Sequence, residues 1–553
     1  MIRSQKPGAS AQTPTPTTRD GDDVVQVEVE VDAHDAINGT ATPETRGGPT
    51  ANGYRYDSIP VCDRAADVEA PSSTSATKPS GARALAPDLL RGLLAMVMAL
   101  DHTAVALQTW QHGTNRNTEA DGVPVRRFNF ATAYLVRTLT HLCGAGFTFL
   151  LGLGVVYLGR SRTTKLGWSP LRLARYFAVR ALVLTAVTAV FGFAVTGGRV
   201  WFLNMVLFAL AVDYFLAGLL WLAFDKTEGL LAEQLTKVLK RSDVTAVDDG
   251  EVRPLLGRRG AGESGAASRA ASLSWHIHNA VLLALSIVTI FWNIWLSENH
   301  GHCEASSSST LPTWMQQRTV SAPQNPFARI WFWPVMGRRV VSGFPPMAWL
   351  SFAVLGLLFG RIAVARTWNP RTLAAGQAFA GVLFALVFAL TRVLRFGNLS
   401  EGCLQTPEHE RHPGANPYLV SPASFFYVVK YPPDVAFWAM TMAGNLFLLA
   451  LFGAIPIRIA KRFTVFLDFG TTALFFYVAH LLLVFLLARI LIGLFGHDTG
   501  VADPMNPDDS WGIDNLFGYF GTWALVMFIL WPICRLYSRF KSGKPMDSIW
   551  RFF

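Results

Sequence analysis

Residues 87–103 read Pro87-Asp-Leu-Leu-Arg-Gly-Leu-Leu-Ala-Met-Val-Met-Ala-Leu-Asp-His-Thr103, and this stretch decides the fold class. It is apolar enough to form a membrane-spanning helix, yet it contains Asp88, Arg91, Asp101 and His102. Ionisable side chains at bilayer depth are costly and often mark functional sites. Steps of three or four residues place Asp88, Arg91 and His102 on one helical face. The helix therefore carries a charged pair at its start and an acid–imidazole pair about three turns later.

The composition of the whole chain also indicates a membrane protein. The 553 residues are 51% hydrophobic and 16% charged, with a mean hydropathy of +0.30, whereas soluble proteins are about 25% charged. The net charge of +10 does not indicate nucleic-acid binding, because the basic residues lie in short loops between apolar runs. We therefore predict an all-α, polytopic membrane protein whose main partner is the lipid bilayer.

Ten apolar runs are long enough to cross a bilayer as helices. They cover about 88–110, 131–158, 172–195, 200–224, 276–296, 344–365, 373–395, 433–455, 464–495 and 513–537. Basic residues concentrate in every second connection and in the C-terminal tail. By the positive-inside rule these connections and both termini are cytoplasmic. The connection between the fourth and fifth runs alone holds eight basic residues: Lys226, Lys237, Lys240, Arg241, Arg253, Arg258, Arg259 and Arg269.

The chain divides into tails and one membrane domain. Residues 1–82 are rich in Thr, Pro, Ser, Gly, Asp and Glu, which predicts a disordered cytoplasmic tail. Residues 83–540 form the transmembrane domain, and residues 541–553 form a cytoplasmic C-terminal tail. Within the domain, residues 226–273 include a Gly-, Ala- and Ser-rich segment. We predict a disordered cytoplasmic linker there.

The long polar loops on the predicted non-cytoplasmic side contain two features of secreted surfaces. Cys303 and Cys403 lie in two of these loops, and we expect a disulfide between them if the compartment is oxidising. Asn398-Leu-Ser400 is a glycosylation sequon in the second loop. No Cys and His spacing resembles a zinc site, so we expect no metal cofactor.

Three histidines and one carboxylate lie toward the non-cytoplasmic side. Asp101 and His102 are in the outer half of the first run, His141 is in the outer half of the second, and His480 is deep in the ninth. Neighbours on a helix point about 100° apart, so Asp101 is not expected to contact His102. We predict that His102 meets His141 or His480 across helices. The alternative for His141 and His480 is a purely structural hydrogen bond between helices.

Five stretches carry a family resemblance. They are Asp88-Leu-Leu-Arg-Gly-Leu-Leu-Ala-Met-Val-Met-Ala-Leu-Asp-His102, Thr140-His-Leu-Cys-Gly-Ala-Gly-Phe-Thr-Phe-Leu-Leu-Gly152, Phe344-Pro-Pro-Met-Ala-Trp349 with Gly356 and Gly360, Lys430-Tyr-Pro-Pro433, and Phe469-Gly-Thr-Thr-Ala-Leu-Phe-Phe-Tyr-Val-Ala-His480. In this order they resemble the heparan-alpha-glucosaminide N-acetyltransferase catalytic-domain family, a group of polytopic membrane proteins. The resemblance covers nearly everything from residue 83 to residue 537.

The resemblance implies acyl transfer across a membrane. The similar lysosomal enzyme moves acetyl from cytosolic acetyl-CoA to a glucosamine amine on the lumenal side. It uses an Asn in its first helix, which corresponds to His102 here, and a His in the next loop, which falls close to His112 if one residue is deleted. The resemblance implies an amine or hydroxyl of a sugar or glycoconjugate as acceptor. Because His102 replaces the Asn, heparan itself is not assumed.

The residues fit such chemistry. A base must take a proton from the acceptor, and an imidazole with a pKa of about 6.5 is suited to this. The candidate catalytic residues are Asp101, His102, His112, His141 and His480. Direct transfer and a covalent acyl-histidine both remain open. The acetyl-CoA or other acyl-CoA co-substrate carries phosphates, for which the candidate ligands are Arg91, Arg175 and Arg180 near the cytoplasmic helix ends.

Several alternatives stay open. A proton-coupled transporter would use the same acidic and histidine side chains as a proton relay, although the sequence shows no internal repeat of the kind that many transporters have. A catalytically degenerate scaffold of the same family is the third hypothesis. Arg91 and Asp88 could form an interfacial ion pair instead of a donor site. The membrane is vacuolar or lysosomal by resemblance, or the plasma membrane, and a homodimer is one option for the oligomeric state.

Overall fold

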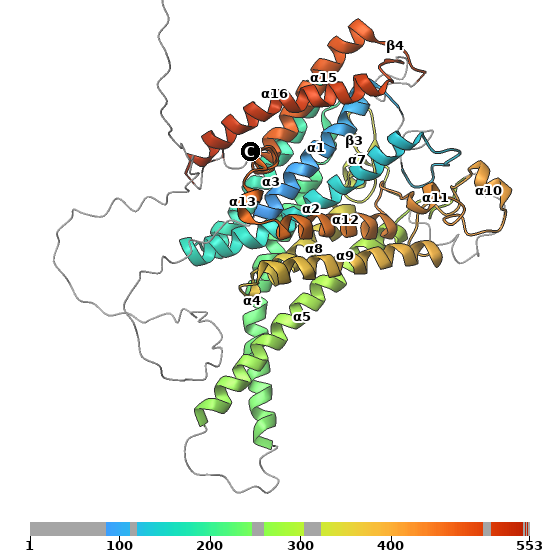
Figure 1. The fold of residues 1–553 in the computed structure, drawn as a ribbon. Coiled ribbons are helices and arrows are strands. Elements are labelled where there is room, and N and C mark those ends of the chain that lie inside the picture. Colours follow the sequence, from blue (N-terminus) through green and yellow to red (C-terminus); the bar gives the residue numbers. More distant parts are fainter. Residues whose placement is uncertain are drawn as a thin grey trace, which may run out of the picture. The chain divides into compact units, whose positions relative to one another are not determined.

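A computed structural model describes residues 85–110, 119–245, 259–303, 322–500, 510–545, 548 and 550. Within these ranges, ten helices are long and apolar enough to cross a membrane. The prediction of an all-α polytopic membrane protein is therefore confirmed (Figure 1). The predicted disordered tail, residues 1–82, lies outside the described ranges.

The ten spanning helices correspond one by one to the ten predicted runs. They are α1 (Leu85–Leu107), α2 (Ala131–Leu166), α3 (Pro170–Val195), α4 (Leu207–Thr245), α5 (Arg259–Trp295), α8 (Pro346–Ala365), α9 (Pro370–Val393), α12 (Val435–Ala454), α15 (Ala473–Phe495) and α16 (Leu516–Ser542). The ninth run, predicted to be one helix over 464–495, is instead divided at Thr472 into α14 (Thr464–Thr471) and α15.

The short elements lie at the two ends of the bundle. One end carries α7 (Pro326–Arg329), α10 (Pro407–Arg411), α11 (Pro422–Phe426), β1 (Phe202–Asn204), β2 (Val335–Met336), β3 (Val340–Ser342), β4 (His497–Asp498) and β5 (Trp511–Gly512). The other carries α13 (Ile457–Ala460) and α14. We call the first the outer end and the second the inner end, after the sides that the positive-inside rule predicts for their loops.

Glycines allow two pairs of helices to pack with their backbones almost in contact. A Cβ atom on Gly92 of α1 would lie 1.9 Å from the carbonyl oxygen of Phe466 in α14. A Cβ atom on Gly152 of α2 would lie 2.0 Å from the carbonyl oxygen of Ala353 in α8. Any larger residue would push these helices apart. This packing fixes α1 and α2, the two helices that carry most of the candidate site.

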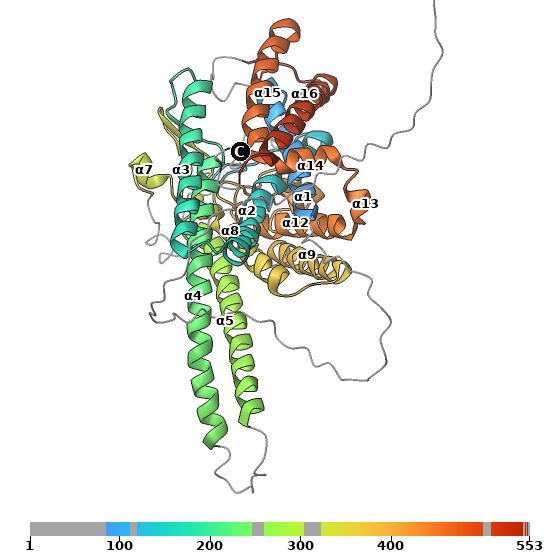
Figure 2. The same ribbon diagram turned by 90° about the vertical axis from the view of Figure 1, so that its left-hand side faces the viewer.

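The prediction of a disordered linker over residues 226–273 is wrong for residues 226–245 and 259–273, and residues 246–258 lie outside the described ranges. Helix α4 continues to Thr245, and α5 begins at Arg259, so the two form a helical hairpin that extends beyond the other helices (Figure 2). The small residues that suggested a linker instead form the contact face of α5. Ala266, Ala270 and Ser274 recur every four residues and are at most 1% exposed. Such a face lets two helices approach closely, which the composition alone did not reveal.

Polar contacts hold the base of this hairpin. The Ser274 hydroxyl donates to the carbonyl oxygen of Glu228 over 2.8 Å, and the Thr227 hydroxyl lies 3.0 Å from Nε2 of His278. The Glu228 carboxylate also accepts from Arg361 of α8 over 2.5 Å. These bonds connect α4 and α5 to the rest of the bundle at the inner end.

A small layer of loops and strands covers the outer end. Strands β1, β3 and β2 form one sheet, in which β1 and β3 are parallel and β2 and β3 are antiparallel. The expected disulfide between Cys303 and Cys403 is present and joins two loops that are 100 residues apart. The backbone of Gly402 also donates to Gly301 over 2.9 Å. The disulfide and this bond hold two outer loops against each other above the helices.

Candidate functional site

An ionic cluster lies between α1, α2 and the loop that joins them. Arg137 of α2 donates through Nη1 to Asp101 of α1 over 2.7 Å. The same guanidinium donates through Nε and Nη2 to the Glu119 carboxylate, over 2.9 and 2.6 Å. Glu119 and Arg137 are 1% and 5% exposed. Two of these three charges are therefore almost completely removed from solvent, and a bidentate guanidinium contact compensates for their desolvation.

Glu119 is held in its charged form. Burial by itself would raise the pKa of its carboxyl, but the Arg137 guanidinium and, to a smaller extent, His141 lower it, so that the pKa ends well below the usual range. A carboxylate that stays ionised in a buried site supplies a fixed negative charge to its neighbours. The nearest imidazole is that of His141, whose Nε2 lies 3.8 Å from Oε1 of Glu119.

His141 has an unusual position among the described residues. It is 4% exposed, and neither ring nitrogen has a hydrogen-bond partner within the described ranges. Its ring meets the edge of Phe437 at 5.5 Å. The neighbours of His141 are thus Glu119 and Phe437, and the partner of His102 is a different residue.

His102 and His480 form a hydrogen-bonded pair between α1 and α15. The distance from Nδ1 of His102 to Nε2 of His480 is 2.7 Å, and the two rings are stacked with an interplanar angle of 13°. Of the two predicted partners of His102, the structure thus brings in His480. His480 is completely buried, whereas His102 is half-buried.

The hydrogen bonds of the pair set its tautomers. Nδ1 of His480 lies 2.9 Å from the carbonyl oxygen of Phe476, and a carbonyl oxygen can only accept. Nδ1 of His480 therefore carries the proton, and its Nε2 accepts from Nδ1–H of His102. In the neutral pair the lone pair of His102 is then on Nε2. This assignment follows from the network and fixes which nitrogen of His102 can act as a base.

Asp101 stands between the two groups. It bonds to Arg137 of the ionic cluster, while its neighbour in sequence, His102, turns toward α15. The two consecutive side chains thus have different hydrogen-bond partners. The ionic cluster and the histidine pair therefore meet at consecutive residues of α1, so a change in the charge of either would be felt by the other.

Lys430, just before α12, is also buried. Lys430 is 4% exposed, and its Nζ lies 5.5 Å from the ring centre of Phe344 and 5.2 Å from that of Tyr431. The backbone nitrogens of Lys430 and Tyr431 both donate to the carbonyl oxygen of Glu119, over 2.8 and 3.1 Å. Two extended segments, 119–121 and 430–432, thus run side by side.

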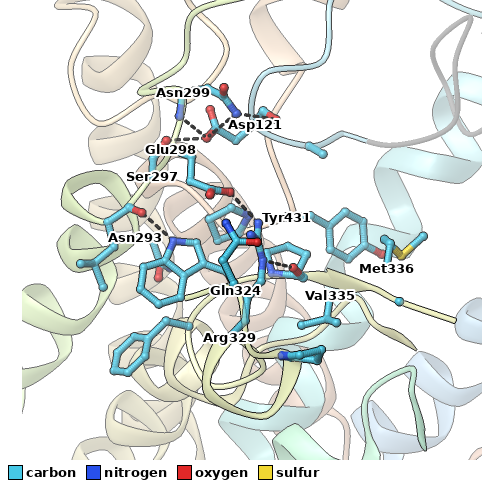
Figure 3. Close-up of a pocket in the computed structure, with 18 residues that line it drawn as sticks. Asp121, Asn293, Ser297, Glu298, Asn299, Gln324, Arg329, Val335, Met336 and Tyr431 are labelled. Carbon is cyan, nitrogen blue, oxygen red and sulfur yellow. Dashed lines mark hydrogen bonds and ion pairs between the residues drawn. The ribbon is translucent and has the colours of Figure 1, made fainter. Parts of the chain in front are cut away.

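Residues of these two segments line a pocket of ≈ 470 Å³ at the outer end (Figure 3). Ala120, Asp121 and Tyr431 line the pocket, while Glu119, the residue before Ala120, belongs to the ionic cluster. The rest of the wall comes from the end of α5, from α7 and from β2. Its polar side chains include Asn293, Glu298, Asn299, Gln324 and Arg329, and its aromatic side chains are Phe332, Trp333 and Tyr431.

The three arginines predicted to bind the donor phosphates do not form one group. Arg91 pairs with Asp88 over 2.7 Å, as the alternative interpretation expected. Arg175 is exposed on α3. Arg180 lies deeper on the same helix, and its guanidinium stacks over the ring of Tyr214 at 4.7 Å. A stacked, half-buried Arg180 is a packing residue here, because its planar group covers an aromatic ring.

Two members of the cluster, Glu119 and Arg137, are absent from the predicted site residues. Arg137 offered a signal, because it is an ionisable residue in an apolar run and lies one helical turn before His141. Glu119 offered none, since it comes from a polar loop of 20 or so residues whose path the sequence does not reveal. His112, a predicted catalytic residue, lies outside the described ranges.

Comparison with known proteins adds no assignment to this geometry. No protein-family model matches the chain, and no curated protein gives a significant match.

Proposed function

We propose that the protein is a membrane acyltransferase that moves an acyl group, acetyl in the simplest case, from acyl-CoA to an amine or hydroxyl at the outer end of the bundle. The observation that carries the proposal is the 2.7 Å hydrogen bond between His102 and His480. This bond and the contact of His480 Nδ1 with the carbonyl oxygen of Phe476 together support Nε2 of His102 as the basic nitrogen. The resemblance of the five sequence stretches supplies the reaction class.

The proposed step is general base catalysis. Nε2 of His102 takes the proton of the acceptor N–H or O–H as the acceptor atom attacks the thioester carbon. The carbon–sulfur bond then breaks, and the imidazolium returns the proton to the leaving thiolate. His480 stabilises the imidazolium by accepting from its Nδ1–H, in the way that a carboxylate does in a catalytic triad. Asp101 supplies negative charge one residue away.

His102→Ala is expected to lower the rate of acyl transfer by about 10² to 10⁴, because it removes the base. The measurement uses purified protein in lipid nanodiscs, acetyl-CoA labelled in the acetyl group, and glucosamine as the probe acceptor, with hydrolysis counted as transfer to water. His497→Ala is the matched control, since this histidine is at the outer end but its side chain is 54% exposed. Wild-type protein that binds and turns over no acyl-CoA would refute the proposal.

Two further variants separate the roles of the other histidines. His480→Gln keeps a hydrogen-bonding side chain but cannot stabilise the His102 cation in the same way. The pH at which the rate is half-maximal is therefore expected to differ from that of the wild-type protein. His141→Ala tests the structural alternative. If it lowers thermal stability and leaves the rate per folded molecule unchanged, His141 is structural; a loss of rate at unchanged stability makes it catalytic.

A carrier is the second candidate function, and a different residue favours it. Asp213 of α4 is completely buried, and neither of its carboxylate oxygens has a hydrogen-bond partner within the described ranges. An acidic side chain in such a place can bind and release protons during transport. A proton-coupled carrier predicts substrate flux into proteoliposomes without acyl-CoA, and Asp213→Asn would abolish it. Acyl transfer without flux would reject this candidate.

A further inference from the structure

One edge of the outer pocket is an exposed apolar and basic surface, which we call the outer lip. It consists of Arg199, Trp201, Phe327, Trp331, Met336, Arg338 and Arg339. Its large apolar side chains are widely exposed: 54% for Trp201, 68% for Phe327, 40% for Trp331 and 85% for Met336. Solvated protein surfaces rarely place four such side chains together.

The outer lip is held together by the sheet and by ring contacts. The backbone nitrogens of Trp201 and Phe202 donate to the carbonyl oxygen of Arg339, over 2.8 and 3.1 Å, and the Arg339 guanidinium lies 4.3 Å from the ring centre of Trp201. Trp331 meets the ring of Phe208 at 5.7 Å. These contacts hold Trp201, Trp331 and Arg339 in a defined arrangement.

The outer lip continues the membrane face of α3. That helix ends at Val195, and near its outer end Val190 and Phe193 are 70% and 56% exposed, as apolar side chains in contact with lipid tails would be. Trp201 lies six residues after Val195. Tryptophan and arginine just beyond the end of a spanning helix are typical of the level of the lipid head groups.

The outer lip carries an excess of positive charge. Residues 326–343 contain Arg329, Arg338 and Arg339 and no Asp or Glu. Arg329 is already paired with Glu298 over 2.6 Å, whereas Arg338 and Arg339 are exposed in the turn between β2 and β3. Basic side chains at a membrane surface attract anionic head groups. The outer lip also borders the pocket directly, because Met336 and Gly337 line that pocket.

We propose that the outer lip binds an anionic phospholipid of the adjacent leaflet, and that the lipid's head group reaches the ≈ 470 Å³ pocket from the plane of the membrane. The acyl chains lie along the exposed end of α3, and the phosphate lies at Arg338 and Arg339. Met336 lies at the entrance of the pocket. This inference stands apart from the proposed acyl transfer.

The first test places a fluorophore on the outer lip. Phe327→Cys and Met336→Cys are labelled with an NBD maleimide in a Cys62→Ser background, since Cys143 and Cys534 are buried and Cys303 and Cys403 are joined. In nanodiscs both labels are expected to emit at shorter wavelength and to be quenched by doxyl-labelled lipids. His412→Cys, exposed on the outer loop after α10, is the control and should report water. Water-like emission at both lip positions overturns the proposal.

The second test measures lipid preference by native mass spectrometry of protein released from nanodiscs of phosphatidylcholine and phosphatidylglycerol. Wild-type protein is expected to retain phosphatidylglycerol, with each of Arg338 and Arg339 contributing about a fivefold preference. The double variant Arg338→Gln, Arg339→Gln should lose that preference, while Arg411→Gln should keep it. Equal retention of the two lipids by wild-type protein, or an unchanged preference in the double variant, contradicts the proposal. The result of this test does not depend on acyl transfer, because a protein that turns over no acetyl-CoA can still retain phosphatidylglycerol.

Discussion

At the scale of single residues, Glu119 is the side chain on which the ionic cluster depends. Removing one member of a buried pair leaves the other charge without compensation, which costs about 3–5 kcal/mol. Glu119→Gln is therefore expected to lower the free energy of unfolding by that amount, measured by thermal unfolding in nanodiscs. Glu401→Gln is the control, because Glu401 pairs with Arg395 at the exposed surface and such pairs contribute less than about 1 kcal/mol. Equal losses in the two variants would contradict the importance of burial.

The same residue has a defined pH dependence. Because folding lowers the pKa of Glu119, its contribution to stability is complete above the pKa of the unfolded chain, about 4.3. It is lost only as the pH falls below that value toward the folded pKa. Glu119 is thus expected to stay ionised from neutral pH down to about pH 5, so its own titration would not account for a change of activity in that range.

Asn398 illustrates how the structure changes the interpretation of a motif. Its Nδ2 donates to the carbonyl oxygen of Thr391 over 2.8 Å, and its Oδ1 accepts from Arg392 over 2.7 Å. Ser400 of the same sequon is 1% exposed. We expect Asn398 to carry no glycan in the folded protein, because a glycan on Nδ2 would displace these bonds. A mobility shift on treatment with a glycosidase, absent in Asn398→Gln, would show the opposite.

At the scale of elements, the disulfide joins two of the outer loops around the pocket. A cross-link that closes a loop of 100 residues stabilises the folded state by up to roughly 4–5 kcal/mol in the chain-entropy model. The double variant Cys303→Ala, Cys403→Ala is expected to unfold at a lower temperature than wild-type protein. Reduction should also add two maleimide-reactive thiols to the denatured chain, counted by mass. An unchanged count after reduction would mean that the bond is absent.

At the scale of the whole molecule, hydropathy was sufficient for the ten spanning helices, because bilayer thickness requires a minimum of about 20 apolar residues in each. Composition predicted a linker at residues 226–273 where helices occur, since alanine and serine are common both in linkers and in close helix contacts. The pairing of His102 with His480 was among the predicted options, because both histidines lie on apolar helices near the same end. The cluster around Arg137 was not predicted, since it needs the path of a loop that carries Glu119 back onto α2.

The hairpin of α4 and α5 has a consequence for the assembly of the protein. It divides the spanning helices into four before residue 245 and six after residue 259, and each part takes one helix of the hairpin with it. The two parts can be made as separate polypeptides divided between these residues. They are expected to associate, because α4 in one fragment can still pack against α5 in the other. Co-purification of the two fragments would demonstrate this. Replacing Ala270 by Asp in the second fragment, which places a charge in the contact face, should prevent it.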